Sequence, residues 1–164
     1  MLSVRKLTKT YAGASERHVL QELDLELDAG EYVAIMGESG IGKSTLLNLI
    51  AGLDTPDSGS VAIGGNELST LDDYQRTLLR RRDIGFIFQA FNLLPRLSVA
   101  QNIALPLTLL GVERREAETR TRAMLERLHL GDRGADQPRT LSSGQMQRVA
   151  IGRALIHRPR LVLA

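Results

Sequence analysis

The stretch "GESGIGKST", residues 37–45, decides the fold of this chain of 164 residues. It follows the continuous apolar run "EYVAIM", residues 31–36, which has the composition of a buried strand. It leads into "KSTLLNLIAGL", residues 43–53, in which apolar residues recur at helical spacing until Gly52. We therefore predict a strand over residues 31–37, a glycine-rich turn, and a helix that ends near Gly52.

This loop matches the pattern G-x-x-x-x-G-K-[ST] at Gly37, Gly42, Lys43 and Ser44. Glycines let the backbone wrap closely around a phosphate group, so that successive N–H groups and the helix N-terminus face its oxygens. Lys43 would bring an ammonium group to the terminal phosphates, and the Ser44 hydroxyl can ligate Mg²⁺. A glycine-rich turn that contains a lysine by chance is the alternative. The position between a strand and a helix favours a nucleoside triphosphate with Mg²⁺ as the ligand.

Strand-like and helix-like segments alternate along much of the chain. Residues 2–7 and 19–27 alternate apolar and polar side chains, which predicts an antiparallel pair with one solvated face. The leucines of the second segment, largely on one side, are Leu20, Leu23, Leu25 and Leu27. Further strands are predicted at residues 59–65 and 84–89, with a helix at residues 72–83 between them. The alternation predicts an α/β fold with a mainly parallel sheet and an antiparallel and a helical appendage.

The pattern turns helical after residue 98. Pro106 lies inside the first helical stretch, so we expect a kink or a break there. The next stretch, residues 114–130, is amphipathic, with an apolar side formed by Ala117, Met124, Leu125 and Leu128. A third helix is predicted to open at Ser142 or Ser143 and to close at Pro159. The apolar run that follows, residues 161–164, has the character of a buried strand.

The bulk composition limits the class of protein. Hydrophobic residues make up 43% and charged residues 24%, which is ordinary for a soluble globular domain of this length. No apolar run approaches the roughly 20 residues that span a bilayer, and we expect a cytosolic chain. The chain has no cysteine, which excludes a disulfide framework and a thiolate metal site. The net charge of +2 comes without a basic stripe, so we expect no nucleic-acid partner. The histidines, His18, His129 and His157, are predicted to be structural or surface residues.

The segment "LSSGQMQRVAIGRALIHRPRLVLA", residues 141–164, resembles the signature region of ATP-binding cassette (ABC) ATPases. The usual signature is L-S-G-G-Q, and here it reads Leu141, Ser142, Ser143, Gly144, Gln145. Tyr11 matches the position of an aromatic residue that stacks on adenine in that family. Gln89 matches the glutamine that contacts Mg²⁺ and the attacking water. The stretch "GFIFQAFNLLPRLSVAQNIALPL", residues 85–107, is most similar to the lipoprotein-releasing and macrolide-export branch.

The resemblance implies a P-loop NTPase fold for a partial nucleotide-binding domain over residues 1–164, with a helical subdomain at about residues 90–145. It implies Mg²⁺ contacts from Ser44 and Gln89 and ATP contacts from Tyr11, Gly37, Glu38, Ser39, Gly40, Ile41, Gly42, Lys43, Ser44, Thr45 and Gln89. The signature residues would contact ATP held by a second subunit in a head-to-tail dimer. Opening and closing of that dimer would drive a membrane permease in export or extraction, at the cytoplasmic face of the inner or plasma membrane.

Two features depart from the family pattern. Ser143 stands where the family usually has Gly, and a Cβ would cost on the order of 1 kcal/mol if that position needs a positive φ or a close backbone approach to phosphate. We therefore predict weakened dimer closure. The chain also ends at Ala164, where the family continues with the Walker B Asp and the catalytic Glu. No catalytic residue is therefore expected within residues 1–164, and we expect this polypeptide alone to be insoluble or molten, without ATPase activity above background.

Three other classes of protein are alternatives to an ABC transporter ATPase. A non-transport ABC ATPase that acts on DNA or ribosomes is disfavoured by the short spacing between phosphate loop and signature and by the absence of a basic stripe. A P-loop kinase or GTPase is disfavoured by "LSSGQ" and by the absence of an N-K-x-D motif. A module that binds ATP without hydrolysing it remains open, because residues 1–164 do not distinguish it from a transporter ATPase.

Overall fold

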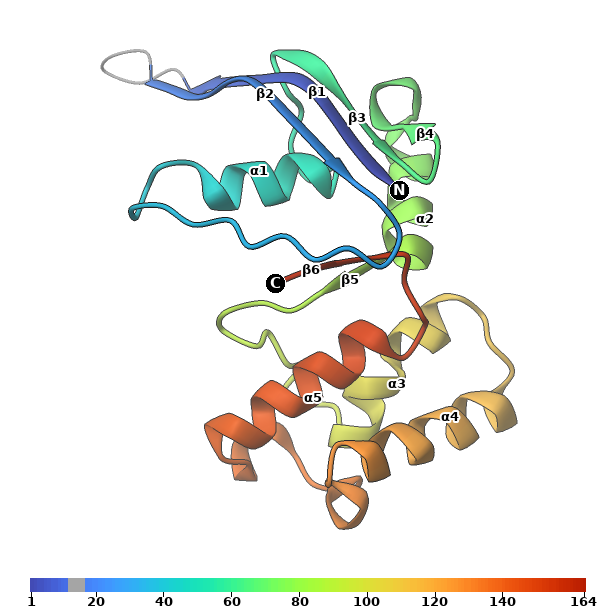
Figure 1. Cartoon of the computed structure of the whole chain (residues 1–164). Coiled ribbons are helices and arrows are strands. Elements are labelled where there is room, and N and C mark those ends of the chain that lie inside the picture. The colour runs from blue at the N-terminus through green and yellow to red at the C-terminus, as the bar shows by residue number, and fades with distance from the viewer. Residues whose placement is uncertain (12–16) are drawn as a thin grey trace. The chain divides into compact units, whose positions relative to one another are not determined.

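A computed structural model of the chain describes residues 1–11 and 17–164. The chain forms two compact units, Met1–Arg80 and Arg81–Ala164 (Figure 1). The first unit holds the phosphate loop, and the second holds the signature segment. Helix α2 (Asp73–Asp83), at the position where a helix was predicted, leads from one unit into the other.

The first unit is built on an antiparallel sheet with the strand order β2-β1-β3-β4. Its strands are β1 (Leu2–Tyr11), β2 (Arg17–Leu27), β3 (Ser58–Ile63) and β4 (Asn66–Glu67). Helix α1 (Lys43–Ile50) lies along one face of this sheet, and the short 3-10 helix η1 (Leu68–Thr70) follows β4. The buried side chains of the sheet and helix include Leu2, Val4, Leu7, Val61, Ile63, Leu46, Leu49 and Ile50. The predicted antiparallel pair and the strand near residues 59–65 are therefore confirmed.

A bulge in β2 explains why Leu20 and Leu23 share a face although they are three residues apart. Leu7 pairs with Leu23 and Lys9 pairs with Leu20, and the register shifts between these two pairs. Glu22 takes up the extra residue with a φ of 44°, and its N–H donates to the Thr8 hydroxyl at 3.1 Å. The bulge shifts the alternation of side chains between the two faces by one residue. Leu20 therefore stays buried while the acidic residues of β2 remain exposed.

The predicted strand over residues 31–37 is not formed in the described part of the chain, and this prediction was wrong. The segment pairs with no strand there, and Tyr32 and Met36 are 89% and 88% exposed. A strand depends on hydrogen bonds to a neighbouring strand, and apolar composition alone does not supply them. The helix predicted to follow the loop is confirmed, because α1 begins at Lys43 and ends just before Gly52, which has a φ of 64°.

Two short strands of the second unit pair in parallel. These are β5 (Ile84–Phe86) and β6 (Leu161–Leu163), with Ile84 opposite Leu161. The strand predicted at residues 84–89 is thus shorter than expected, and the apolar run near the chain end forms a strand as predicted. Gly85 lies against the backbone of Ala154, and a Cβ on Gly85 would be 2.2 Å from the Ala154 carbonyl oxygen. Only glycine therefore fits at that point of β5.

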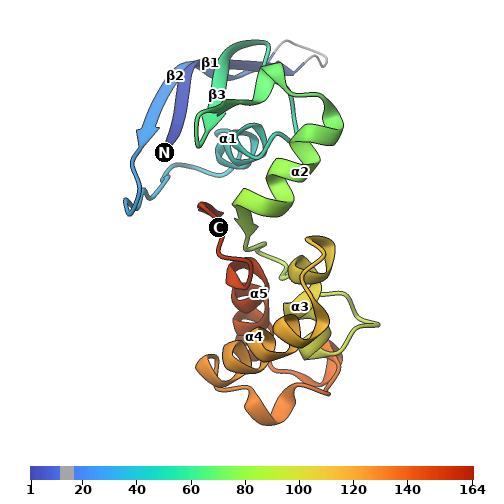
Figure 2. The same cartoon turned by 90° about the vertical axis from the view of Figure 1, so that its right-hand side faces the viewer.

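Three helices of the second unit pack side by side (Figure 2). They are α3 (Val99–Leu109), α4 (Arg114–Arg127) and α5 (Ser143–Leu155), with the short 3-10 helices η2 (Gly131–Arg133) and η3 (Pro138–Thr140) between the last two. Their shared core consists of Val99, Ile103, Leu107, Leu125, Leu130, Leu141, Val149 and Ile156. The apolar side predicted for α4 is confirmed, because Leu125 is buried and Ala117, Met124 and Leu128 pack against this core.

Pro106 does not break α3. The helix continues to Leu109, and the Leu110 N–H donates to the Pro106 carbonyl at 3.0 Å. Of the predicted kink or break, the break is therefore wrong, because burial of Ile103 and Leu107 on either side of the proline holds the helix together. The fully buried Asn102 ties the preceding segment to the helix. Its Nδ2 donates to the Leu94 carbonyl oxygen, and its Oδ1 accepts from the Leu94 N–H.

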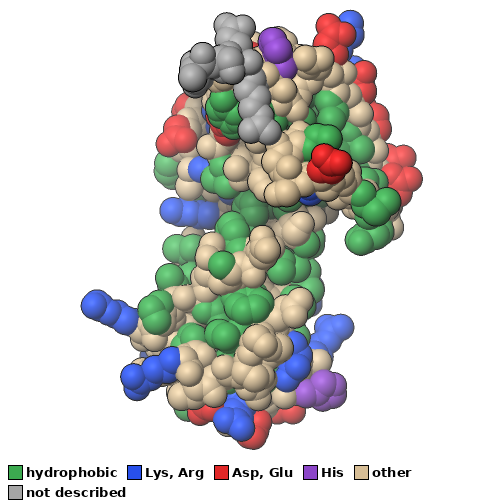
Figure 3. Space-filling model, turned by 90° about the vertical axis from the view of Figure 1, so that its left-hand side faces the viewer, with side chains coloured by type: hydrophobic (Ala, Val, Ile, Leu, Met, Phe, Trp, Pro, Cys, Tyr) green, Lys and Arg blue, Asp and Glu red, His purple; other side chains and the backbone are tan. Residues whose placement is uncertain are grey.

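Hydrophobic side chains reach the surface of the second unit on the face shown in Figure 3, with Lys and Arg side chains around its edge. Exposed apolar residues of this unit include Phe88, Leu94 and Leu155. Gathered exposed apolar side chains are typical of interaction surfaces. Within the part of the chain that the structure describes, no helix is both long and apolar enough to cross a membrane.

Candidate functional site

Glycine is required at Gly42, the last residue of the phosphate loop before α1. Its φ is 112°, a conformation that a side chain makes costly. A Cβ at this position would also lie 2.6 Å from Val19 Cγ1 and 3.0 Å from the Val19 carbonyl oxygen. The loop therefore passes close over β2, and α1 begins immediately afterwards.

The start of α1 presents backbone N–H donors and a positive charge. Among the described residues, no side chain caps the helix at Gly42 or accepts from its first N–H groups. The Lys43 ammonium folds back over the loop and donates to the carbonyl oxygens of Gly37 at 2.8 Å and Glu38 at 2.7 Å. A phosphate group could accept from both the N–H groups and the ammonium, so the geometry suits an anion.

The residues predicted to hold magnesium provide only part of a coordination sphere. Ser44 is exposed near the start of α1, and its hydroxyl has no hydrogen-bond partner among the described residues. Those residues contain no group of three or more His, Cys, Asp or Glu side chains that could hold a metal. Mg²⁺ usually keeps waters and takes one or two protein ligands together with substrate phosphates. Ser44 fits such an ion, whose remaining ligands would be nucleotide phosphates and water.

Tyr11 lies at the end of β1 and is tied to the turn that follows α1. Its hydroxyl donates to the Asp54 carboxylate at 2.7 Å, and its side chain is 41% exposed. The Lys9 ammonium donates to the same carboxylate at 3.1 Å and lies 5.1 Å from the centre of the Tyr11 ring. The Tyr11 hydrogen bond is the main cause that lowers the pKa of Asp54, so this carboxylate is ionised at neutral pH.

The signature segment forms the N-terminus of α5. Ser142 caps the helix by accepting from the Gln145 N–H at 3.3 Å, and Gln145 Oε1 accepts from the Ser142 N–H at 2.8 Å. Leu141 is buried and anchors the segment, whereas Ser142, Ser143 and Gly144 are exposed. Three of the signature residues thus present polar or small groups to solvent at a helix N-terminus.

Ser143 is not strained in this structure. It is the first residue of α5 and is absent from the described residues with positive φ. Ser143 therefore does not need a positive φ, and the predicted backbone cost from this cause is corrected. Crowding against a bound phosphate is a separate condition and stays a prediction. Gly144 likewise has open space around it, because a Cβ there would meet nothing within 4 Å.

Gln89 is exposed in the turn after β5. The next residues of this segment are fixed to α5, because Arg153 donates to the carbonyl oxygens of Asn92 at 2.6 Å and Phe91 at 2.7 Å. Burial lowers the pKa of Arg153, and Phe91 and Asn92 have positive φ values of 60° and 47°. No local pattern indicated this role for Arg153, which lies 61 residues after Asn92.

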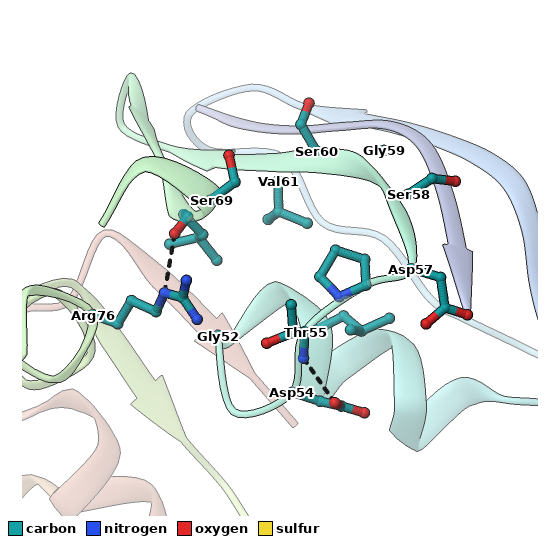
Figure 4. A pocket seen from close by; sticks show the side chains of 13 residues that line it. Gly52, Asp54, Thr55, Asp57, Ser58, Gly59, Ser60, Val61, Ser69 and Arg76 are labelled. Atoms are coloured by element: carbon teal, nitrogen blue, oxygen red, sulfur yellow. Dashed lines mark hydrogen bonds between the residues drawn. The ribbon is translucent and has the colours of Figure 1, made fainter. Parts of the chain in front are cut away.

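A cavity of about 140 Å³ lies behind the turn that carries Asp54, between the end of α1, β3 and η1 (Figure 4). Arg76 closes one side of it and donates to the Leu68 and Leu71 carbonyl oxygens at 3.1 Å and 3.0 Å. Sites for small organic ligands usually measure about 300 Å³ or more. This cavity is therefore too small for a nucleotide, and the phosphate loop is the better candidate site.

A family model described as ABC transporter matches residues 20–164, and the chain therefore belongs to the ABC transporter family. It is an ABC ATPase domain with the α/β fold of that class.

Individual relatives agree with this assignment. The chain is 51% identical over 164 residues to the lipoprotein-releasing system ATP-binding protein LolD of Pseudomonas syringae pv. tomato, covering 99% of this chain and 72% of that protein. It is 43% identical over 166 residues to the pyoverdine export ATP-binding/permease protein PvdT of Pseudomonas aeruginosa, covering 100% of this chain and 25% of that protein. Among solved structures, the dimeric ATP-binding cassette MJ0796 bound to ADP and Pi is 42% identical with a TM-score of 0.90, covering 100% of this chain and 73% of that one.

Proposed function

We propose that this chain is the ATP-binding subunit of an ABC transporter and binds Mg-ATP at the phosphate loop. The observation that carries the proposal is the start of α1, where an uncapped helix N-terminus meets the Lys43 ammonium and the close turn at Gly42. The glycines and backbone of the loop would surround the β- and γ-phosphates. The loop residues with this role are Gly37, Glu38, Ser39, Gly40, Ile41, Gly42, Lys43, Ser44 and Thr45.

Three further contacts complete the proposed nucleotide site. Tyr11 would stack on adenine, because its ring is partly exposed at the end of β1 and is held in one orientation. Ser44 and Gln89, both exposed, would contact the magnesium ion. When bound, that ion would neutralise charge on the phosphates. The exposed signature residues would contact ATP on a second subunit, with the N-terminus of α5 facing its phosphates.

Coupling to a membrane permease is supported by the relatives. One of them is named for lipoprotein release and another for pyoverdine export, and the solved MJ0796 cassette is a dimer. We infer that two copies of this chain's cassette close around ATP and drive export or extraction of a substrate. The cassette would then lie at the cytoplasmic face of the membrane. The exposed apolar side chains of the second unit are the candidate contact surface for a partner protein.

A polypeptide of residues 1–164 alone is proposed to bind nucleotide without turnover. Lys43, Ser44 and Gln89 bind and orient phosphates and metal, but none of them has a carboxylate that could polarise a water molecule. By the family resemblance, that carboxylate would follow Ala164. The helical subdomain at about residues 90–145 is likewise proposed by resemblance.

Nucleotide binding is tested by titration calorimetry of the full-length protein with Mg-ATP. Lys43→Ala should weaken the affinity by about tenfold or more, because it removes a charge-assisted contact to phosphate. Lys6→Ala is the matched control, since it removes one exposed lysine of the first unit that belongs to β1 and not to the loop. Equal affinities for the Lys43→Ala variant and the unmodified protein would contradict the proposal.

A further inference from the structure

We propose that Asp54 is a positioning residue for the nucleobase, because it fixes the orientation of Tyr11 and thereby sets the affinity for ATP without affecting the phosphate contacts. This inference rests on the proposed function, in which Tyr11 is the platform for adenine. Asp54 belongs to neither the phosphate loop nor the signature, and lies in the turn "DTPDSG" after α1.

The first support is the way in which Asp54 is itself held. Its Oδ2 accepts from the Tyr11 hydroxyl at 2.7 Å, and its Oδ1 accepts from the Lys9 ammonium at 3.1 Å and the Thr55 N–H at 2.7 Å. Figure 4 shows the Thr55 bond in the turn. A carboxylate with three donors has one favoured orientation, and hydrogen bonds to a charged acceptor are stronger than neutral ones. Asp54 therefore provides a fixed acceptor for the tyrosine.

The second support is that the turn is fastened to the same strand that carries Tyr11. The Asp57 carboxylate accepts from the Thr10 N–H at 2.6 Å, and the Asp57 N–H donates to the Thr8 carbonyl at 3.0 Å. Lys9 adds a bond from its ammonium to the Thr55 carbonyl at 2.6 Å. These three bonds join residues 8–10 of β1 to Thr55 and Asp57, so the turn that carries Asp54 is held against the strand that carries Tyr11.

The third support is that Lys9 occupies space beside the Tyr11 ring. Its ammonium lies 5.1 Å from the ring centre, within the range of a cation–π contact. An aromatic ring has two faces, and a base can stack only on a face that is not covered. Lys9 and Asp54 together thus define both the tilt of the ring and the face that can accept a base.

The fourth support is the link to the phosphate loop through α1. The loop precedes this helix and the Asp54 turn follows it, so one helix of about 12 Å connects the two sites. The side chain of Thr45, in the first turn of α1, also forms a hydrogen bond with the Tyr11 hydroxyl. The pKa of Tyr11 is raised chiefly by the Asp54 hydrogen bond, and Thr45 acts in the opposite direction. The base platform and the phosphate site are therefore connected through α1 within the first unit.

The test compares Mg-ATP with inorganic tripolyphosphate and Mg²⁺, which has no base, as ligands of the full-length protein. Asp54→Ala and Tyr11→Phe each remove the same hydrogen bond and should each weaken ATP binding by about fivefold. The double variant should be no weaker than either single variant. Tyr11→Ala should cost more, because it also removes the ring. Tripolyphosphate affinity should stay within about twofold in all four variants.

Asp73→Ala is the matched control, because Asp73 is an exposed acid of the same unit whose side chain makes no hydrogen bond or ion pair with the described residues. It should change neither affinity. Unchanged or tighter ATP binding by Asp54→Ala would overturn the inference. An equal loss of ATP and tripolyphosphate binding would also overturn it, because Asp54 would then support only the local fold. If the unmodified protein bound neither ligand, the proposed function itself would fail.

Discussion

Lys43 donates its ammonium protons to two carbonyl oxygens of its own loop, at Gly37 and Glu38. This arrangement keeps the charge at the start of α1 rather than in solvent. The same loop depends on Gly42, whose backbone conformation and contact with Val19 leave no room for a side chain. At the scale of single residues, the site therefore depends on one charge and one missing Cβ.

Gly42→Ala tests the second requirement. We expect a loss of roughly 1–3 kcal/mol in the free energy of unfolding, because the new Cβ combines a left-handed φ with a clash against β2. Gly144→Ala is the control, since its Cβ would meet nothing within 4 Å and alanine favours a helix. Chemical denaturation measures both variants. Equal stability of Gly42→Ala and the unmodified protein would contradict the geometry described for the loop.

The site residues differed in how far the sequence could predict them. The phosphate loop and the signature are continuous motifs, so their residues could be named from the sequence. Asp54 could be recognised only as a turn residue, because its contact with Tyr11 joins positions 43 residues apart. Arg153 was missed for the same reason, since its partners Phe91 and Asn92 come from a distant segment. Long-range hydrogen bonds of this kind leave no local pattern.

At the scale of elements, helices were predicted well and one strand was not. The helices α1, α3, α4 and α5 follow from apolar periodicity, and α3 and α5 each begin at a serine with glutamine three residues later, which forms a capping box. Residues 31–37 have strand composition but no partner strand among the described residues. The hydrogen bonds of a helix are local, whereas a strand needs a neighbouring strand. The sequence pattern therefore predicts helices more reliably than strands.

His157 links the end of α5 to β5. Its Nε2 lies 3.2 Å from the Ile84 carbonyl oxygen, and its Nδ1 is buried without a hydrogen-bond partner among the described residues. Burial lowers the pKa of His157, the Ile84 carbonyl and Asp83 act to raise it, and Arg120 lowers it further. The neutral imidazole is therefore the form that suits the fold, with the proton on Nε2.

This predicts a pH dependence of stability. Because the pKa is lower in the folded state, the unfolded chain binds more protons as the pH falls below about 6.5, the ordinary histidine value. The contribution of His157 is fully present above that pH and is lost as the pH falls through the folded-state pKa. His157→Gln should flatten the decline in the free energy of unfolding over this window. An unchanged pH profile in the variant would contradict the assignment.

At the scale of the whole molecule, the chain is an ABC ATPase domain whose two units carry different parts of the family's motifs. The phosphate loop and Tyr11 belong to Met1–Arg80, and Gln89 and the signature belong to Arg81–Ala164. The exposed signature at the N-terminus of α5 fits the head-to-tail dimer proposed for this protein.

Ser143 provides a test of that dimer. Its backbone is unstrained, so any cost of the side chain must come from crowding against the phosphate of the opposite subunit. Ser143→Gly should then strengthen ATP-induced dimerisation of the full-length protein by up to about fivefold, which corresponds to about 1 kcal/mol. Ser143→Ala keeps the Cβ and should show no such gain. Sedimentation at several ATP concentrations measures the effect, and equal affinities for Ser143→Gly and the unmodified protein would refute it.

The central claim is that the loop before α1 binds the phosphates of ATP. A crystal structure of the full-length protein with Mg²⁺ and a non-hydrolysable ATP analogue tests it most directly. The account predicts the phosphates against the N-terminus of α1, with the Lys43 ammonium moved from the Gly37 and Glu38 carbonyl oxygens to the phosphates and the base on the Tyr11 ring. A nucleotide bound elsewhere, with Lys43 still on its own loop, would contradict it.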